Sequence, residues 1–252
     1  MRLPAIKFSG RIMYSRTFDS VQKAAAELLQ ALDEKNREIV QFPFGFDIEW
    51  KPSFHKDDPP SKVAVMQICT DSSHCHVLHL IHSGIPPNLQ LLQICHCYKL
   101  DFLFFFFCLR QLINYVSFNT KFGVRKVGVG IDSDATKVFR DYKISVKGVT
   151  DLSFHAKQKL GGDRNWGLSS LTEKLLSKQL KKPKKITLGN WETPVLSKEQ
   201  LEYAATDAFA SWYLYQAIKD LPDAQVTDKS RKVDGCVTKF RPWWRRRGRN
   251  RF

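Results

Sequence analysis

Five side chains in three separate segments have types and spacings that suit a catalytic site. Asp47 and Glu49 lie two positions apart in a segment typical of a β-strand, so their carboxylates share one face of it. Tyr203 and Asp207 are four positions apart in a helical segment and share one face of that helix. Asp134 follows another short apolar strand, near the start of a helix. Carboxylates that share a site repel one another unless a cation lies between them.

Each of these signals also has a purely structural explanation when it stands alone. An acidic pair at the end of a strand is often simply solvated. On an amphipathic helix, the Tyr203 ring would pack at the rim while Asp207 faces water. Asp134 lies where a helix cap is needed, although Asp132 is better placed for that role. Only the combination of the three segments therefore indicates a function.

The elements that must position these residues alternate between strands and helices. Strands are expected over residues 39–50, 63–68, 75–80, 126–131 and 144–149, and helices over residues 18–32, 132–142, 152–160, 167–180 and 198–221. The last helix begins with Ser197-Lys198-Glu199-Gln200, the pattern of a capping box. This order predicts a mixed α/β layout.

The three segments together resemble the motifs of a known enzyme family. Three sequences, FDIEW at residues 46–50, GIDSD at 130–134 and YAATD at 203–207, occur in the order of the motifs of the DEDD superfamily of exonucleases. The tyrosine of the last motif makes the chain similar to the DEDDy branch of that superfamily. Further matches at residues 8–15, 63–69, 165–171 and 196–203 are similar to Werner-type exonuclease domains, in a plant-like stand-alone form. The resemblance covers residues 8–92 and 125–221.

The resemblance implies a ribonuclease H-like α/β fold, in which a mixed β-sheet is flanked by α-helices. Two Mg²⁺ or Mn²⁺ ions would be held by four carboxylates, those of Asp47, Glu49, Asp134 and Asp207. Tyr203 would orient the attacking water. The implied activity is 3′→5′ exonucleolytic hydrolysis of nucleic acid, with DNA preferred over RNA and nucleoside 5′-monophosphates as products. DNA-repair proteins are the implied protein partners.

Two other functions remain open at this point. The first is a nucleic-acid-binding protein with an intact exonuclease fold but impaired catalysis. The second is an RNA-processing exonuclease similar to RNase D, which would share the metal site and differ in substrate. One local departure bears on substrate contact, because Thr136 stands where relatives often carry an aromatic residue that could stack on the strand.

The charge of the 252-residue chain favours a polyanionic partner. Forty Lys and Arg residues against 25 Asp and Glu residues give a formal net charge of +15, which favours nucleic acid. Residues 223–252 contain ten Lys or Arg and three Asp, and we expect a flexible basic tail there, after an exonuclease domain over residues 1–222. The tail could bind phosphate and act as a nuclear localisation signal, so we expect a nuclear protein, with the cytoplasm as a second location.

The Phe-rich segment at residues 93–125 fits neither helical nor strand periodicity. It includes four consecutive Phe residues at 104–107, which translated pyrimidine-rich DNA would also give. We favour a retained intron, and a buried helix in a genuine insertion is the alternative. Related domains have a much shorter connection here. The segment would therefore either expose an apolar patch or displace Asp134.

Three further patterns and one absent motif bear on the function. A zinc site is disfavoured among His74, Cys75, His76, His79 and His82, because alternate strand residues face opposite ways. The lysines at 178, 181, 182, 184 and 185 form either a solvated surface or a track for phosphates. No P-loop pattern occurs, which excludes a P-loop motor in this chain. With no secretory signal and no apolar run near the ~20 residues of a membrane span, we expect an intracellular protein outside the membrane.

Overall fold

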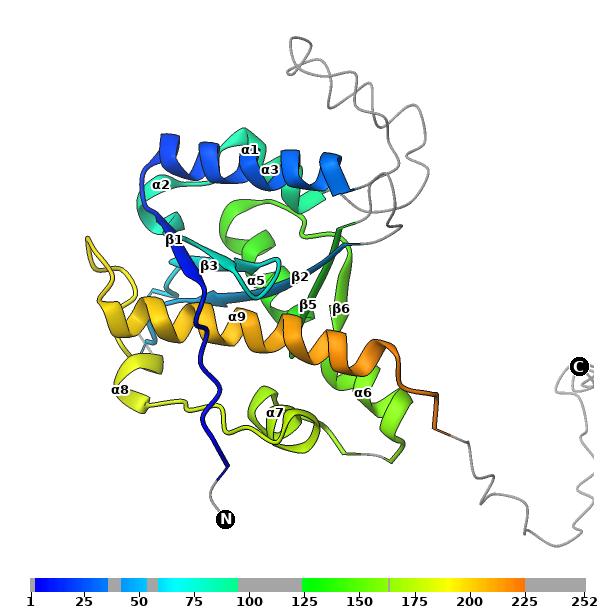
Figure 1. The fold of residues 1–252 in the computed structure, drawn as a ribbon. Coiled ribbons are helices and arrows are strands. Elements are labelled where there is room, and N and C mark those ends of the chain that lie inside the picture. The colour runs from blue at the N-terminus through cyan, green and yellow to red at the C-terminus, as the bar shows by residue number, and fades with distance from the viewer. Residues whose placement is uncertain (1–2, 36–41, 54–58, 95–123, 163, 225–252) are drawn as a thin grey trace, which may run out of the picture.

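A six-stranded mixed sheet forms the centre of the computed structural model (Figure 1), which describes residues 3–35, 42–53, 59–94, 124–162 and 164–224. Its strands are β1 (Arg11–Ser15), β2 (Phe42–Glu49), β3 (Val65–Cys69), β4 (His74–Leu78), β5 (Val124–Gly128) and β6 (Val149–Asp151). The strands lie in the order β1-β4-β3-β2-β5-β6, and all run in the same direction except β3. The carboxyl ends of β2 and β5 therefore lie at the same edge of the sheet.

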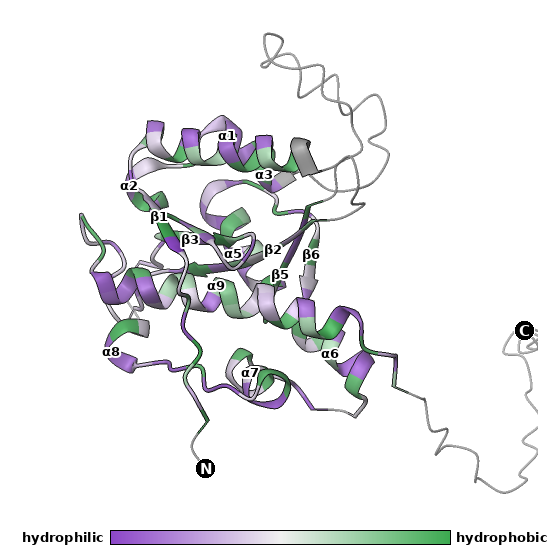
Figure 2. Ribbon diagram, in the orientation of Figure 1, coloured by the Kyte–Doolittle hydropathy of each residue, from purple (hydrophilic) through white to green (hydrophobic). Residues whose placement is uncertain are grey.

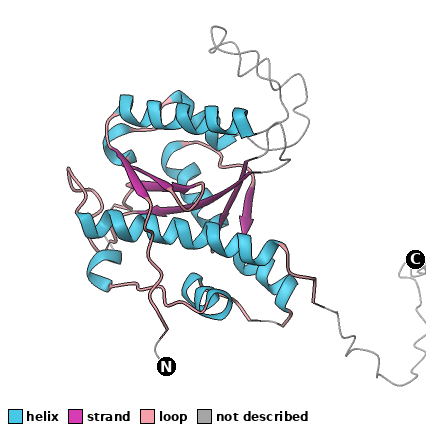
Figure 3. Ribbon diagram, viewed as in Figure 1, coloured by secondary structure: helices cyan, strands magenta, loops and turns pink. Residues whose placement is uncertain are grey.

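Helices cover both faces of this sheet (Figures 1 and 3). The helices are α1 (Phe18–Lys35), α2 (Leu80–Ser83), α3 (Pro87–Ile94), α5 (Ile131–Tyr142), α6 (Leu152–Leu160), α7 (Leu168–Leu176), α8 (Lys184–Thr187) and α9 (Lys198–Lys219). Helices α1 and α3 lie on one side of the sheet, and the long helix α9 crosses the other side together with α6 and α7. The capping box predicted for the last helix is present: Ser197 Oγ accepts from Gln200 N at 3.2 Å.

The alternation of side chains along β2 divides the core into two layers. Phe44, Phe46 and Ile48 are buried on the face covered by α1, α3 and α5. The opposite face, which carries Asp47 and Glu49, lies under α9. In Figure 2 the outer helices carry both hydrophilic and hydrophobic residues, as expected for helices that bury one side. The β2 sequence thus sends apolar side chains into one core layer and two carboxylates toward α9.

The structure corrects two local predictions and adds one strand that the sequence did not predict. Residues 144–148 form no strand, because the backbone amide of Lys147 donates to Gln93 O and Gly148 has a φ of +71°; strand β6 begins only at Val149. Strand β1 was not predicted. Asp132 does not cap α5: Gly130 occupies the N-cap position, and Asp132 lies within the first helical turn.

The Phe-rich segment and most of the basic tail lie outside the described residues. The chain leaves α3 at Ile94 and re-enters the sheet at Val124, which pairs in register with Phe42 at the start of β2. Val124 is therefore level with a point five residues before Asp47, or roughly 16 Å along the strand from it. In the described part of the tail, Asp223 pairs with Lys159 of α6 at 2.9 Å.

A buried lysine fixes the place where the Phe-rich segment joins the sheet. Lys126 of β5 is fully buried, and its Nζ donates to the carbonyl oxygens of Gln93 at 3.2 Å and Lys147 at 2.9 Å. These bonds tie the end of α3 to β5 and to the chain before β6. In the described part of the chain, no helix has the length and apolar character to cross a membrane.

Candidate active site

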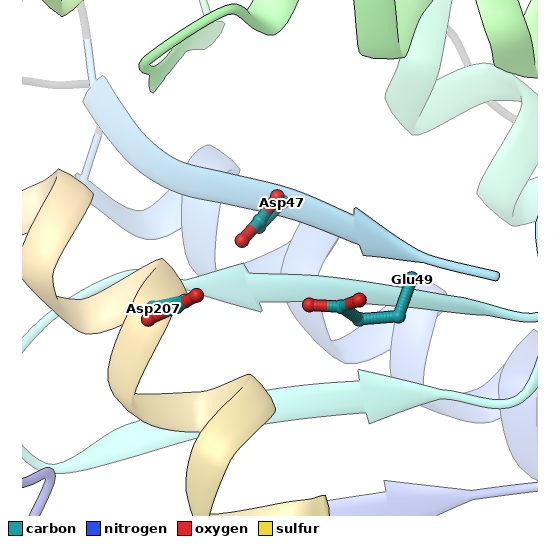
Figure 4. Close-up of side chains that lie close together, drawn as sticks. All are labelled: Asp47, Glu49 and Asp207. Atoms are coloured by element: carbon teal, nitrogen blue, oxygen red, sulfur yellow. The ribbon is translucent and has the colours of Figure 1, made fainter. Parts of the chain in front are cut away.

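Three of the predicted carboxylates converge between β2 and α9. Asp47 and Glu49 project from β2, and Asp207 projects toward them from α9 (Figure 4). One ligand oxygen from each side chain lies within 4.8 Å of the other two. No other group of three His, Cys, Asp or Glu side chains converges in this way among the residues that the structure describes. Segments 160 residues apart in the sequence thus form one acidic cluster.

Small residues allow α9 to approach β2 closely enough for this cluster to form. Ala204, Ala205 and Ala208 are fully buried against the sheet. On β2, a Cβ atom at Gly45 would overlap the carbonyl oxygen of Ala208 and lie 2.8 Å from the backbone nitrogen of Trp212. Only glycine fits at position 45 while α9 keeps this position. The close packing places Asp207 opposite the two carboxylates of β2.

Asp134 lies beside the cluster but is not one of the three converging residues. It is in the first turn of α5, and its charge contributes to the electrostatics of Asp47 and Glu49. The turn before it is held by Asp151, which the sequence did not single out: Asp151 Oδ2 accepts from Gly130 N at 2.6 Å. The other oxygen of Asp151 caps α6 by accepting from Ser153 N at 2.8 Å. An Asp before a helical segment predicts the cap, but nothing in the sequence predicts the bond to Gly130.

Burial makes the ionised form of these carboxylates unfavourable. The pKa of Asp47 is raised well above its ordinary value, first by burial and then by the charges of Asp207 and Asp134. Burial and the neighbouring Asp47 raise the pKa of Glu49 to about 9. Burial and Asp151 raise the pKa of Asp134 to about 7. A bound cation would reverse these shifts, because it favours the charged form of each group.

The cluster has the donor set that Mg²⁺ and Mn²⁺ prefer. Both cations favour carboxylate oxygens, and the three converging side chains offer only oxygen ligands. Asp207 is 1% exposed, and its Oδ1 has no hydrogen-bond partner in the part of the chain that the structure describes. A buried carboxylate oxygen without a partner is costly unless something binds it. Asp47, Glu49 and Asp207 therefore fit a divalent cation.

Tyr203 lies one helical turn before Asp207 on α9. Its side chain is 8% exposed and packs against the fully buried Trp191, with ring centroids 6.1 Å apart. Burial, together with the charges of Asp207 and Glu49, raises the pKa of the Tyr203 hydroxyl far above its ordinary value. The hydroxyl therefore keeps its proton at neutral pH in this arrangement, which suits it to orient a water molecule by hydrogen bonding.

Lys182 is part of the site, although from the sequence it was only one member of a basic run. Its Nζ lies 2.8 Å from Asp207 Oδ2 and 5.8 Å from the centroid of the Tyr203 ring. Its charge lowers the pKa values of Asp47, Glu49 and Asp134, against the larger effect of burial. The segment between α7 and α8 thus supplies a cation to the cluster. No pattern in the sequence separates Lys182 from the neighbouring lysines.

Two of the histidines that follow β4 are hydrogen-bonded to other groups of the chain. His79 Nδ1 lies 2.7 Å from the Tyr14 hydroxyl, and its Nε2 lies 2.9 Å from the Trp191 carbonyl oxygen. His82 Nε2 lies 2.9 Å from the carbonyl oxygen of Thr193. Burial lowers the pKa of His79 to about 4, so the ring is neutral and links β1 to the loop before α9.

Comparison with known proteins agrees with this geometry. A family model described as "3'-5' exonuclease" matches residues 19–221, which include all five predicted site residues. A 3'-5' exonuclease from Arabidopsis thaliana is 50% identical over 221 residues, which cover 88% of this chain and 68% of the relative. The chain belongs to the 3'-5' exonuclease family. As a member of it, the protein is a hydrolase that acts on nucleic acid.

A more distant exonuclease relative supports the resemblance to Werner-type domains. The mouse bifunctional 3'-5' exonuclease/ATP-dependent helicase WRN is 31% identical over 225 residues, which cover 89% of this chain and 14% of that protein. The 3'-5' exonuclease of Drosophila yakuba is 28% identical, and the chain spans 58% of its length. This exonuclease therefore corresponds to one part of these longer relatives.

Solved structures confirm the ribonuclease H-like α/β fold that the resemblance implied. The Aedes aegypti Nibbler EXO domain is similar with a TM-score of 0.58 at 19% identity, covering 85% of this chain and 91% of that one. RNase D from Escherichia coli is similar with a TM-score of 0.55 at 15% identity, and the match covers 82% of this chain and 43% of that one. The Trypanosoma brucei RNase D complex with RNA U12 has a TM-score of 0.59 at 14% identity. That match covers 85% of this chain and 65% of the RNase D chain.

Proposed function

We propose that this exonuclease removes nucleotides one at a time from the 3′ end of a nucleic-acid strand, with DNA preferred and two Mg²⁺ or Mn²⁺ ions as cofactors. The convergence of Asp47, Glu49 and Asp207, with one buried oxygen of Asp207 left without a partner, carries this proposal. Asp134 is the fourth proposed ligand, since α5 begins just after the carboxyl end of β5, which runs parallel to β2. The products would be nucleoside 5′-monophosphates.

The roles of the individual residues follow from their positions. Two bound ions would supply an activated water on one side of the phosphodiester and stabilise the leaving 3′-oxygen on the other. Asp47, Glu49, Asp134 and Asp207 would hold the ions. The Tyr203 hydroxyl, one helical turn from Asp207, would orient the attacking water. The buried packing of Tyr203 against Trp191 keeps that hydroxyl in place.

The choice between DNA and RNA rests on two different similarities. We place DNA first because the motifs resemble Werner-type domains. The mouse WRN protein, which is 31% identical to this chain, is a relative of that type. RNA is the second candidate, because the fold is also similar to RNase D, whose Trypanosoma brucei structure contains RNA U12. Both substrates present the same phosphodiester to the carboxylates, so the 2′-position decides between them.

An inactive nucleic-acid-binding protein is ranked below an active enzyme. That alternative requires the Phe-rich segment to distort the site. The described ends of the segment, Ile94 and Val124, lie at the end of the sheet opposite to the carboxyl end of β2. Distortion would have to be transmitted along β2 and β5, which pair in register over residues 42–45 and 124–127.

Charge supports a nucleic-acid partner and a nuclear location. The formal net charge of +15 suits a polyanionic substrate, and the basic residues 223–252 supply a proposed nuclear localisation signal. The cytoplasm is a second location. DNA-repair proteins are the proposed protein partners, on the strength of the Werner-type resemblance.

Digestion of matched strands tests the proposed function. DNA and RNA of one sequence, labelled at the 5′ end, are incubated with the full chain in Mg²⁺, in Mn²⁺ and in EDTA. We expect a ladder that shortens from the 3′ end in either metal, faster on DNA, and no cleavage in EDTA. Faster digestion of RNA would favour the RNase D-like function, and an intact strand in both metals would favour a binding protein.

A further inference from the structure

The ammonium of Lys182 occupies a place beside a proposed metal ligand. Its Nζ lies 2.8 Å from Asp207 Oδ2, and the Asp207 side chain is 1% exposed. Among the described residues, Lys182 supplies the only ammonium or guanidinium nitrogen within 4.0 Å of the proposed metal-binding carboxylates. The cluster therefore already holds one cation, and the protein itself provides it.

The backbone that carries Lys182 is held by its neighbours, while the Lys182 side chain is partly exposed. Leu180 is buried and packs with Ile6 and with Ala210 of α9. The N-terminal segment holds the preceding residue, since Ile6 N donates to Gln179 O at 3.0 Å. Pro183 restricts the Lys182 backbone to extended conformations. The Lys182 side chain itself is 39% exposed, so it has a route from the cluster to solvent.

The contact to Asp207 conflicts with metal binding at the same oxygen. The Lys182 ammonium points a proton at Asp207 Oδ2, and a divalent ion bound there would meet a like charge at close range. Metal ligation by Oδ2, alone or together with the unpartnered Oδ1, therefore requires the ammonium to leave. Once it leaves, a phosphate of the bound strand is a strong alternative partner, because a lysine ammonium binds phosphate as a point charge.

We propose that Lys182 is an exchangeable counter-ion of the metal site: it holds Asp207 in the metal-free enzyme, gives way to the divalent ion and then pairs with a phosphate of the substrate strand. This inference rests on the proposed metal-dependent function. It makes metal and strand binding cooperative, since the strand gives the displaced ammonium a new partner. By linkage, each of the two ligands then raises the affinity of the other.

Thermal unfolding with and without Mn²⁺ tests the exchange. Lys182→Met is compared with wild type and with Lys181→Met, which removes the same charge from the exposed neighbouring residue. In EDTA we expect Lys182→Met to unfold at a lower temperature than wild type, because Asp207 loses its buried partner. In saturating Mn²⁺ this deficit should disappear, since the ion has replaced the ammonium. An equal deficit under both conditions would make Lys182 a structural ion pair and overturn the proposal.

Calorimetric titration with Mn²⁺ tests the coupling to substrate. Without a strand, Lys182→Met should bind Mn²⁺ roughly tenfold more tightly than wild type or Lys181→Met. A DNA strand with a cleavage-resistant phosphorothioate at its 3′-terminal linkage should raise the Mn²⁺ affinity of wild type more than that of Lys182→Met. Equal enhancement in both proteins would overturn the exchange. Wild type that binds no Mn²⁺ at all would instead overturn the proposed function, and this inference with it.

Discussion

Gly45 of β2 faces Ala208 of α9 so closely that a Cβ atom at position 45 would overlap the Ala208 carbonyl oxygen. Asp47 lies two residues after this glycine, and Asp207 lies immediately before this alanine. The contact therefore sets the separation between the two carboxylates. The packing of α9 on β2 and the geometry of the site therefore both depend on the absence of a side chain at Gly45.

Alanine at position 45 should damage both stability and activity. The added methyl group must push α9 away from β2, and overpacking of this kind costs about 1–3 kcal/mol. For a chain of this size we expect the melting temperature to fall by roughly 2–4 °C per kcal/mol. Exonuclease activity should fall by at least tenfold, since α9 carries Tyr203 and Asp207. Gly167→Ala is the control, because its nearest neighbour would be at 3.9 Å. Full activity in Gly45→Ala would show that the separation of α9 and β2 is not critical.

Loss of the Tyr203 hydroxyl should slow the chemical step without weakening substrate binding. Tyr203→Phe keeps the ring against Trp191 and removes only the group that orients water. We expect the single-turnover rate to fall by about 100-fold or more, with little change in affinity for a DNA strand. Tyr213→Phe is a matched control on the same helix, where the side chain is partly exposed. If the two variants cleave at equal rates, Tyr203 has only a packing role.

Metal binding should release protons at neutral pH. Without metal, the raised pKa values of Glu49, about 9, and Asp134, about 7, keep protons on these groups that the ions must displace. The apparent Mn²⁺ affinity should therefore rise with pH between 6 and 9. Calorimetry at pH 7 in two buffers of different ionisation enthalpy measures the release. An enthalpy that is the same in both buffers would mean that the ligands are already ionised.

The same pKa shifts fix how the stability of the metal-free protein depends on pH. The folded chain holds a proton on Glu49 up to a pH of about 9, whereas the unfolded chain releases it near its ordinary value of 4.5. The folded state binds more protons within this range, so Glu49 contributes a free energy of unfolding that falls as pH rises. His79 has the opposite effect between its folded pKa of about 4 and its ordinary value of 6.5. In that range the unfolded chain binds more protons, so the contribution of His79 to the free energy of unfolding rises with pH.

The parts of the site that lie on regular strands and helices could be predicted from the local sequence. The spacing of Asp47 and Glu49 places both on one face of a strand, and that of Tyr203 and Asp207 places both on one face of a helix. The capping box at Ser197 likewise marks where α9 begins. Period and capping are properties of short segments, so they can be read without knowing the fold.

Contacts between distant segments could not be predicted in the same way. The bond from Gly130 to Asp151 and the ion pair of Lys182 with Asp207 join residues 21 and 25 positions apart. Residues 144–148 have strand-like composition, but Lys147 bonds to Gln93 and Lys126 instead of to a strand partner. In each case tertiary packing, not local preference, decides the partner.

Removal of residues 95–123 should improve solubility without changing the chemistry. A short polar loop between Ile94 and Val124 keeps the bonds of Lys126 to Gln93 and Lys147. The Phe-rich sequence favours self-association, and its loss should give a more soluble and more stable enzyme. The turnover rate per folded molecule should change by less than about twofold, because Val124 is far from Asp47 along the sheet. Light scattering, thermal unfolding and the rate on a labelled strand provide the readouts.

The outcome also decides what the Phe-rich segment is. A deletion variant that is unfolded, beside a full chain that is monomeric and active, would make the segment a true structural element. The retained-intron interpretation would then be wrong.

The central claim is that the carboxylates of β2 and α9 form the metal-dependent catalytic site, and cleavage of a labelled strand by Asp47→Asn tests it most directly. Asp132→Asn is the control, since Asp132 is exposed in the first turn of α5. In Mn²⁺ we predict that wild type and Asp132→Asn shorten the strand from its 3′ end at similar rates. Asp47→Asn should fold and cleave at least ~1000-fold more slowly. Persistent cleavage by folded Asp47→Asn, or by wild type in EDTA, would contradict the assignment.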